Sequence, residues 1–242
     1  MSLYRDEAVV LRTQKLGEAD RIVTVLSRRH GRIRAVAKGV RRTTSRFGAR
    51  LEPFSHVDLQ LAEGRSLHVV TQAESLGPLA TSVGSDYRAY TAGTAMLEAA
   101  DRLAGEDLEP ALQHYLLLVA ALRALAAPDR DPSLVLDAFL LRSLAVAGYA
   151  PSFDACAHCG APGPHRAFSP ASGGMTCPAC RPSGAVAPAP ETVRLLSALL
   201  SADWATALTS EPRARRESSR LVGTYLGWHL ERGLRSLTHV DR

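Results

Sequence analysis

The sequence lacks the features of a membrane or exported protein. No window reaches the roughly eighteen uninterrupted apolar residues that a membrane helix needs. The most apolar stretch, residues 115–127, carries Arg123 in its middle. Residues 1–12 mix charged with apolar residues, unlike the start of a signal peptide. We therefore expect a cytoplasmic protein.

Lysine and aromatic residues are scarce. Only Lys15 and Lys38 among the 29 basic residues are lysines, so an arginine at any one position carries little information. Aromatic side chains make up 5% of the 242 residues. In the first third they are Tyr4, Phe47 and Phe54. A surface that holds many bases by aromatic stacking is therefore disfavoured there.

Acidic residues are absent from residues 21–51, although residues 28–50 hold nine lysines or arginines. Residues 1–79 contain 14 basic against 8 acidic side chains, whereas residues 80–242 contain 15 against 16. The whole basic excess of the chain (net charge +5) thus belongs to its first third. Such asymmetry is typical of proteins that bind nucleic acid or another anionic surface. The alternative is a solvated surface without a partner.

The first third has the patterns of short strands. Alternating or β-branched segments occur at residues 7–14, 21–27, 32–38, 56–62 and 66–74, with glycines in the connections. Five short strands suit a small closed or partly open barrel, in which closure removes exposed sheet edges. The oligonucleotide-binding barrel is the first candidate, and a small SH3-like barrel is also compatible with the pattern.

Residues 80–242 change to a helical period. Apolar residues recur three and four apart at residues 86–104, 108–127, 132–149, 191–208 and 215–237. Asp131 or Ser133 can cap the third of these helices, and Gly148 marks its end. We expect an α+β protein with an N-terminal five-stranded oligonucleotide-binding barrel at 1–79. A helical domain at 80–242 follows, with a zinc-ribbon-like insertion at 150–190.

All four cysteines lie in that insertion, in the pattern C-x2-C-x17-C-x2-C. They are Cys156, Cys159, Cys177 and Cys180. Two such pairs complete a tetrahedron around zinc, and four sulfurs leave no open position for water or substrate. We therefore expect one structural Zn²⁺. Two disulfides and a redox-active pair are the alternatives, and His158 and His165 are interpreted as surface histidines.

Catalytic motifs are missing from the sequence. Lys38 is followed by Gly-Val-Arg, so the Lys-x-Asp-Gly motif of nucleic-acid ligases is absent. The phosphate-cradling G-x-x-x-x-G-K-[ST] motif is absent as well. We expect a binding protein rather than an enzyme. A DNA-end-processing enzyme and an RNA-binding zinc protein are the rival interpretations.

The candidate nucleic-acid surface follows the strand at 32–38 and the loop after it. In an oligonucleotide-binding barrel, strands 2 and 3 and the neighbouring loops line the groove. The expected phosphate contacts are Arg32, Arg34, Lys38, Arg41, Arg42, Arg46 and Arg50. Phe47 is the one candidate for stacking on a base, whereas Phe54 is expected in the core or at its rim.

Three segments resemble the RecO family of bacterial recombinational-repair proteins. Residues 10–54 carry the family's Gly-Glu-Ala-Asp turn, the glycine turn at Gly31 and the run of cations before Leu-Glu-Pro-Phe. Residues 156–180 carry the paired cysteines with Phe-Ser and Gly-Gly between them, and residues 225–237 match the closing helix. The order and spacing of the three segments make the resemblance specific over essentially the whole chain.

The resemblance implies a non-enzymatic mediator of homologous recombination, associated with the nucleoid. RecO-like proteins bind single- and double-stranded DNA, anneal complementary strands and contact single-strand-binding protein. With RecR they help RecA to displace that protein from single strands. Here the seven cations listed above would form the DNA-binding face.

Binding that depends on phosphates should be sensitive to salt. Raising the salt from about 50 to 200 mM should weaken single-stranded DNA binding at least about tenfold, because each phosphate contact releases counterions. A filter-binding titration at several salt concentrations measures this slope. Binding that does not change with salt would contradict the phosphate-dominated interpretation.

Overall fold

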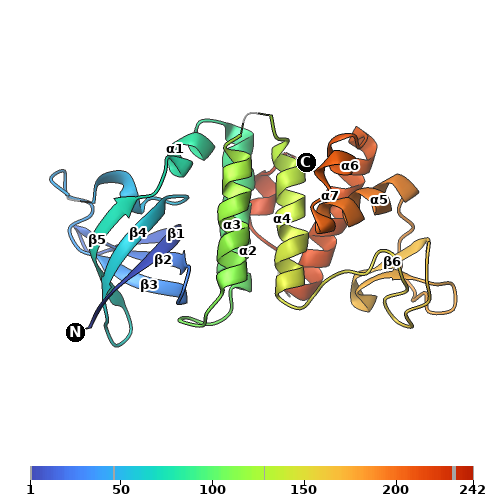
Figure 1. The fold of residues 1–242 in the computed structure, drawn as a ribbon, viewed down its shortest axis with the longest axis horizontal. Helices are drawn as coiled ribbons and strands as arrows, with labels where there is room; N and C mark the ends of the chain where they lie inside the picture. Colours follow the sequence, from blue (N-terminus) through green and yellow to red (C-terminus); the bar gives the residue numbers. More distant parts are fainter. Residues whose placement is uncertain (1, 46, 128, 231–232, 242) are drawn as a thin grey trace. The chain divides into compact units, whose positions relative to one another are not determined.

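The computed structural model describes residues 2–45, 47–127, 129–230 and 233–241. The chain forms two compact units, Met1–Asp129 and Arg130–Arg242. The first unit holds strands β1–β5 and helices α1–α3, and the second holds helices α4–α7 and the cysteine region (Figure 1). The boundary at residue 79 that the sequence suggests marks the end of the barrel strands, inside the first unit.

The five predicted strands form a closed barrel. They are β1 (Leu3–Leu16), β2 (Asp20–Ser27), β3 (Gly31–Ala37), β4 (His56–Ala62) and β5 (His68–Ser75). Their order is β1-β2-β3-β5-β4, and β1 also pairs with β4 to close the barrel. Neighbours are antiparallel except β3 and β5, which pair in parallel through Ala35 and Val36. This order is that of an oligonucleotide-binding barrel and not of an SH3-like one.

Strand β1 is longer than predicted because it serves two neighbours. Its first half, Leu3–Val9, pairs with β4, and the segment from Ala8 to Leu16 pairs with β2. The register with β2 shifts between Val10 and Arg12, so a bulge at Leu11 bends the strand where it turns from one neighbour to the other.

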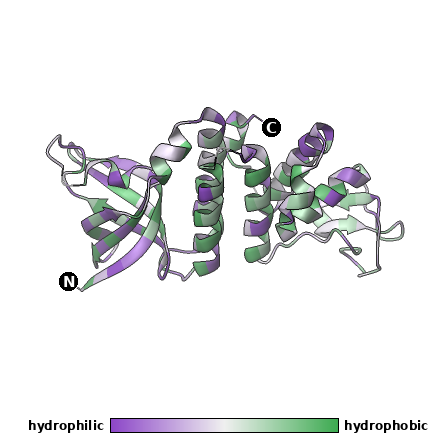
Figure 2. Cartoon of the chain, turned by 45° about the horizontal axis from the view of Figure 1, so that its top comes forward, coloured by the Kyte–Doolittle hydropathy of each residue, from purple (hydrophilic) through white to green (hydrophobic). Residues whose placement is uncertain are grey.

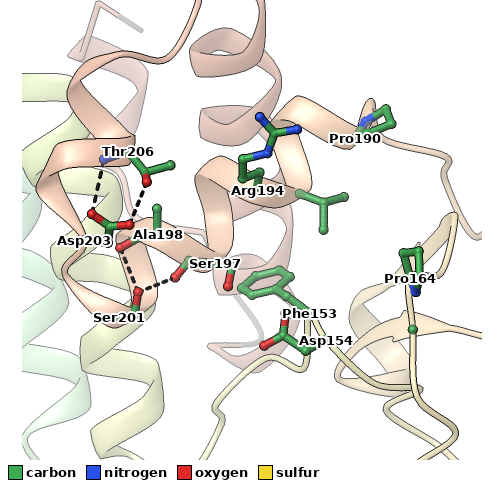
Figure 3. Close-up of a pocket in the computed structure, with 12 residues that line it drawn as sticks. Phe153, Asp154, Pro164, Pro190, Arg194, Ser197, Ala198, Ser201, Asp203 and Thr206 are labelled. Atoms are coloured by element: carbon green, nitrogen blue, oxygen red, sulfur yellow. Dashed lines mark hydrogen bonds between the residues drawn. The ribbon is translucent and has the colours of Figure 1, made fainter.

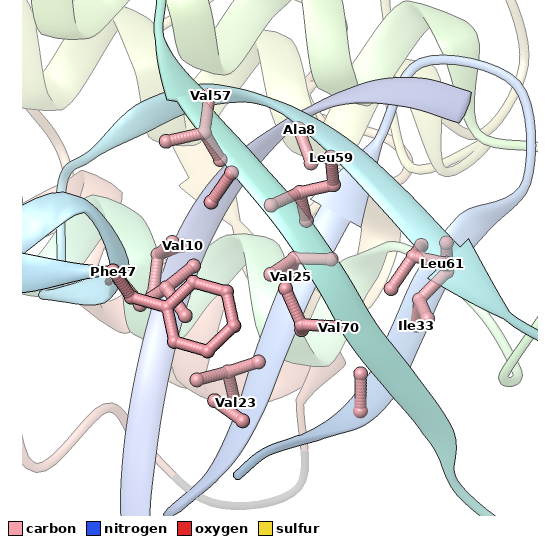
Figure 4. Close-up of a cluster of buried hydrophobic side chains, with 14 of the residues drawn as sticks. Ala8, Val10, Val23, Val25, Ile33, Phe47, Val57, Leu59, Leu61 and Val70 are labelled. Atoms are coloured by element: carbon pink, nitrogen blue, oxygen red, sulfur yellow. The ribbon is translucent and has the colours of Figure 1, made fainter. Parts of the chain in front are cut away.

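Alternate residues of the strands fill the interior of the barrel. Val10, Val25, Ile33 and Leu59 are completely buried there. Phe47, from the loop after β3, inserts its ring among them and is 2% exposed (Figure 4). Burying a side chain of this size stabilises the fold by about 1.5–3 kcal/mol. The prediction that Phe47 stacks on a base is therefore wrong, since its ring is part of the core.

The outer face of β1 and β2 is buried as well. Val9, Leu11 and Leu26 point away from the interior, yet each is at most 4% exposed. Helices α2 (Tyr87–Leu103) and α3 (Leu112–Leu125), both predicted from the sequence, pack across these strands. A short helix that was not predicted, α1 (Leu79–Gly84), contacts α2 and α3. Helices therefore cover one side of the barrel.

A chain of hydrogen bonds ties α3 to the barrel. The Tyr115 hydroxyl donates to Glu7 Oε2 (3.2 Å), and Arg28 Nη1 donates to the same oxygen (3.1 Å). The Tyr115 oxygen also lies 2.8 Å from His56 Nε2. Because the tyrosine proton goes to Glu7, His56 Nε2 must be the donor to Tyr115. Burial lowers the pKa of His56 and so favours its neutral form, with the proton on Nε2.

The second unit packs four helices. They are α4 (Pro132–Val146), α5 (Pro190–Ser201), α6 (Trp204–Leu208) and α7 (Pro212–His229). Helix α4 contacts α5 and α7, which also contact each other. Asp131 caps α4 as predicted, accepting a hydrogen bond from Ser133 N at 3.0 Å. A buried hydrogen bond from Ser219 Oγ to Asp137 Oδ2 (2.5 Å) joins α7 to α4.

Two predicted helices have different bounds. The segment 191–208 breaks at Ala202, whose φ is 61°, because the Asp203 carboxylate accepts hydrogen bonds from Thr206 and so starts α6. The last helix begins at Pro212 and ends at His229 instead of running over 215–237. Residues 231 and 232 lie outside the described part of the chain, and a short 3-10 helix, Ser236–His239, follows.

Figure 2 shows that the helices of both units carry hydrophobic residues on part of their surface and hydrophilic residues on the rest. Such mixed surfaces are typical of helices that pack on one side. Among the described residues, no helix combines the length and the apolar character needed to cross a membrane.

Removing the Phe47 ring should destabilise the first unit. We expect Phe47→Ala to lower the free energy of unfolding by about 3–5 kcal/mol, the usual cost of deleting a buried aromatic ring. Phe47→Leu, which keeps most of the volume, should cost less than half as much. Urea denaturation followed by circular dichroism measures both changes. Equal and small losses would contradict a core role for Phe47.

Candidate nucleic-acid interface and metal site

The predicted cations lie on three successive segments of the first unit. Arg32 and Arg34 lie on β3, and Lys38, Arg41 and Arg42 lie in the loop that follows it. Arg50 belongs to the 3-10 helix Gly48–Leu51, which precedes β4. Arg46 lies outside the described residues. We call residues 32–50 the basic track.

The first cation of the track, Arg32, is held by acidic residues of the same unit. Its Nε donates to Asp107 Oδ1 at 2.6 Å, and its Nη1 donates to the Asp101 carbonyl oxygen at 2.6 Å. The neighbouring Arg34 is half-buried, and its Nε has no hydrogen-bond partner within the described chain. Strand β3 thus carries one guanidinium paired with acidic residues and one whose buried Nε lacks a partner in the described chain.

The loop after β3 is fixed against the turn between β1 and β2. Arg41 Nη1 donates to the carbonyl oxygens of Gly17 (3.2 Å) and Glu18 (2.8 Å). Gly39 N donates to Asp20 Oδ1 at 2.7 Å. These bonds order the loop, and they show that Arg41 stabilises its shape.

Lys38, Arg42 and Arg50 are exposed. In the described part of the chain, the side chains of Lys38 and Arg42 make no ion pair or hydrogen bond. Thr43 and Thr44, next along the loop, are also exposed and add hydroxyl groups. The loop half of the track therefore offers cations to an anionic partner more freely than β3 does.

A hollow of about 440 Å³ lies beside this loop in the first unit. It is lined by Ser45, Phe47, Gly48, Ala49, Arg50, Ser55, Ser75, Gly77, Pro78, Ala80 and Thr81. Arg50 is the one charged side chain among these lining residues, and hydroxyl groups supply most of the other polar side-chain atoms. The hollow therefore continues the positive character of the track beyond the loop.

Carboxylates from β1 neutralise the beginning of the basic stretch. Arg28 pairs with Glu7 (3.1 Å), and His30 Nδ1 lies 2.7 Å from the buried Asp6. The sequence from 21 to 51 contains no acid, but the fold supplies acids from elsewhere. The exposed positive surface is consequently smaller than the sequence suggests.

Aromatic side chains are not displayed along the track. Phe54 is 4% exposed and packs edge-to-face on Tyr90, which confirms the prediction that it belongs to the core or its rim. Tyr4 is half-buried, and its ring centroid lies 4.7 Å from that of His30. The described residues of the track thus offer no exposed aromatic ring for stacking on bases.

The four cysteines come together in the second unit. Their sulfur atoms all lie within 4.8 Å of one another, and the thiols are free rather than disulfide-bonded. Gly160 N donates to the Cys156 carbonyl oxygen, and Cys180 N donates to that of Cys177, so each pair is folded into a tight turn. A short hairpin, β6 (Ala167–Ser169) and β7 (Gly174–Thr176), joins the two turns. Four sulfurs in this arrangement fit a tetrahedral metal ion.

Hydrogen bonds polarise the thiols of this cluster. Those from the backbone N–H groups of Cys177 and Cys159 lower the pKa of Cys156 to about 5. Hydrogen bonds with the Cys177 and Cys159 side chains raise the pKa of Cys180 to about 12. His165 Nε2 instead lies 2.9 Å from the Ala161 carbonyl oxygen, outside the metal cluster. The four sulfurs are therefore the candidate donor set, and His165 lies outside it.

A second hollow, of about 530 Å³, lies in the second unit (Figure 3). Its lining includes Phe153, Asp154, Pro164, Arg194 and Asp203. Thr206 donates to Asp203 from its hydroxyl (2.6 Å) and its backbone nitrogen (3.1 Å), and these bonds hold the pKa of Asp203 below its ordinary value. Asp203 is thus engaged in capping α6, and the lining residues include no histidine or cysteine.

The closed barrel and the four-cysteine cluster define a class: an oligonucleotide-binding-type barrel followed by a helical region with a metal-site insertion. Comparison with known proteins gives the family. The model described as Recombination protein O N terminal matches residues 1–79, and that described as Recombination protein O C terminal matches residues 84–238. The chain belongs to the RecO family.

Its relatives include proteins named DNA repair protein RecO from three bacteria. That of a Nocardioides strain is 63% identical over 243 residues, which cover 99% of this chain and all of the relative. Those of Streptomyces coelicolor and Thermobifida fusca are each 60% identical, and both chains are covered completely. The match therefore includes the barrel, the helices and the cysteine region.

The site residues that sequence reasoning missed are acidic. Asp101 and Asp107, on and after α2, hold Arg32 although they follow it by about seventy positions in the chain. The segment 104–111 reads AGEDLEPA, and this acid-rich composition was the one signal in the sequence that the basic residues could have an acidic partner there. A pairing between residues so far apart requires knowledge of how α2 and α3 pack on the barrel.

Replacing a ligand should remove the metal. We expect Cys177→Ala to lose bound metal and to lower the melting temperature of the second unit, because a structural metal contributes folding free energy. His165→Ala should keep the metal, since four sulfurs complete the site. Elemental analysis and thermal unfolding measure these effects. Full metal content in Cys177→Ala would contradict the four-sulfur assignment.

Proposed function

We propose that this chain is a non-enzymatic, DNA-binding mediator of recombinational repair in the cytoplasm, associated with the nucleoid. It binds single- and double-stranded DNA and anneals complementary single strands. With RecR it helps to load RecA onto DNA coated by single-strand-binding protein. Membership of the RecO family supports this role.

The observation that carries the proposal is the exposed loop half of the basic track. Lys38 and Arg42 are exposed on a loop that Arg41 orders, and Arg50 is exposed on the 3-10 helix that follows. We infer that phosphates of a DNA strand contact these side chains. The full proposed set is Arg32, Arg34, Lys38, Arg41, Arg42, Arg46 and Arg50. The hollow beside Arg50 then accepts the sugar and phosphate of the next nucleotide, where the strand runs past the end of the loop.

The same geometry suits annealing. Two DNA strands repel each other, and a cationic face lowers this repulsion and raises their local concentration. The described track displays no aromatic ring, because Phe47 belongs to the core. Bases on the track would consequently stay free to pair with a second strand.

The metal in this proposal is one structural Zn²⁺, held by Cys156, Cys159, Cys177 and Cys180. Zinc prefers four thiolates in tetrahedral geometry, and such a site has no open coordination position. Its role is to hold the two cysteine turns and the hairpin between them. In this proposal residues 1–79 bind DNA, and residues 80–242 form the helical domain with the zinc-binding insertion at 150–190.

Charge reversal on the loop tests the site. We expect Lys38→Glu combined with Arg42→Glu to weaken single-stranded DNA binding at least about tenfold, because two phosphate contacts become repulsive. Both side chains are exposed, so the fold should be unaffected. Fluorescence anisotropy with a labelled oligonucleotide measures the affinity, and circular dichroism checks the fold.

The matched control is Arg213→Glu with Arg216→Glu, two exposed cations in the first turns of α7. This variant changes the net charge equally and should retain most of the binding. An equal loss in both variants would mean that overall charge, and not the track, determines affinity.

Function is tested by annealing complementary oligonucleotides coated with single-strand-binding protein. We expect the wild-type chain to accelerate annealing and the loop variant to do so less. No acceleration by the wild-type chain would remove the mediator role. Competition between single-stranded DNA and structured RNA of equal charge tests the RNA-binding alternative, which a strong preference for RNA would favour.

A further inference from the structure

The loop between α2 and α3 is strongly acidic. Residues 104–111 include Glu106, Asp107 and Glu109 and contain no lysine or arginine. All three acidic residues are exposed. This acidic loop lies beside β3, where the basic track begins.

Backbone and side-chain bonds hold the acidic loop on β3. Leu108 N donates to the Arg32 carbonyl oxygen at 2.9 Å, and Arg32 and Asp107 form a parallel bridge. The Arg32 guanidinium donates from Nε to Asp107 Oδ1 at 2.6 Å. The loop therefore adds to β3 like a short extra strand and brings a carboxylate onto the first arginine of the track.

A glycine makes this close approach possible. Gly31 has a φ of +65°, and a Cβ at this position would lie 1.7 Å from the Glu109 carbonyl oxygen. Strand β5 pairs with β3 further along, at Ala35 and Val36. The acidic loop thus occupies the part of the β3 edge that precedes β5.

We propose that the acidic loop competes with DNA for Arg32. The proposal rests on the proposed function, in which the track binds phosphates. A guanidinium binds carboxylate and phosphate oxygens through the same N–H groups, so Asp107 and a DNA strand cannot both occupy them fully. In the free protein the loop fills the beginning of the track, and a bound strand displaces Asp107 from Arg32.

This competition makes affinity depend on the length of the strand. A short oligonucleotide gains its contacts from the loop at 38–50 and leaves Asp107 in place. A longer strand brings enough additional phosphates to offset the lost ion pair. Leu108 has a φ of 65°, which is unfavourable for a branched side chain, so the docked loop is not in its most relaxed conformation. The acidic loop therefore selects against short, weakly bound anions.

The first test neutralises one carboxylate. Asp107→Asn should tighten binding of a thirty-residue oligothymidylate about threefold to tenfold at low salt, the scale of the net free energy of one hydrogen bond. Glu74→Gln is the matched control, because Glu74 is an exposed carboxylate on β5 whose ion pair is with Arg5. It should change affinity less than about twofold, since its ion pair is with Arg5, which is not a cation of the track.

A double-mutant cycle shows whether Arg32 carries the effect. The gain from Asp107→Asn should disappear when Arg32→Gln is also present. A gain that persists without Arg32, or that equals the gain from Glu74→Gln, overturns the competition.

A second measurement follows the acidic loop directly. The Leu108 amide donates to the Arg32 carbonyl oxygen, so its hydrogen exchange should accelerate when the thirty-residue oligothymidylate is bound. Unchanged or slower exchange in a DNA-saturated sample overturns loop displacement even if affinity rises. Failure of the proposed function is a separate outcome. In that case the wild-type chain would not bind DNA, or it would bind with the same affinity as the chain with Lys38→Glu and Arg42→Glu.

Discussion

The first unit depends on the double pairing of β1. This strand joins β4 through its first half and β2 through its second, and the bulge at Leu11 bends it between the two. The pairing closes the barrel and leaves β1 without a free edge. The pairing places the apolar Val9 and Leu11 on the outer side of the barrel, where helices α2 and α3 pack on β1 and bury them. The position of the acidic loop between these helices follows from that packing.

Charge on the barrel is arranged by the fold as much as by the sequence. The basic stretch begins beside carboxylates of β1 and meets the acidic loop at Arg32. Further along, the exposed side chains of Lys38 and Arg42 make no ion pair or hydrogen bond within the described chain. Exposed cations keep their hydration until a phosphate arrives, whereas paired ones must first lose a partner. The two halves of one sequence segment therefore differ in how readily they bind an anion.

Features that depend on neighbouring residues in the chain could be predicted from the sequence, whereas those that depend on contacts between distant segments could not. Strand alternation and the helical period are local, so five strands and most helices were predictable, as was the four-cysteine cluster from its spacing. Phe47 was misinterpreted because nothing local distinguishes an aromatic residue in a basic loop from one that folds back into the core. The break at Ala202 was missed because an apolar period continues across it, and the cap at Asp203 overrides that period. The pairing of Arg32 with Asp107 joins distant segments and required the tertiary structure.

The confinement of every cysteine to residues 156–180 has a practical consequence for spectroscopy. The barrel and helices α1–α3 contain no thiol, so a cysteine introduced at Thr43, which is exposed in the track loop, would be the sole thiol of its unit. In the proposed zinc site the native four are bound to the metal, so a fluorophore or spin label could be attached selectively to the introduced cysteine. The proposed metal would thus shield the native thiols from the labelling reagent. The motion of the track loop could then be observed with Thr43 as the one residue replaced.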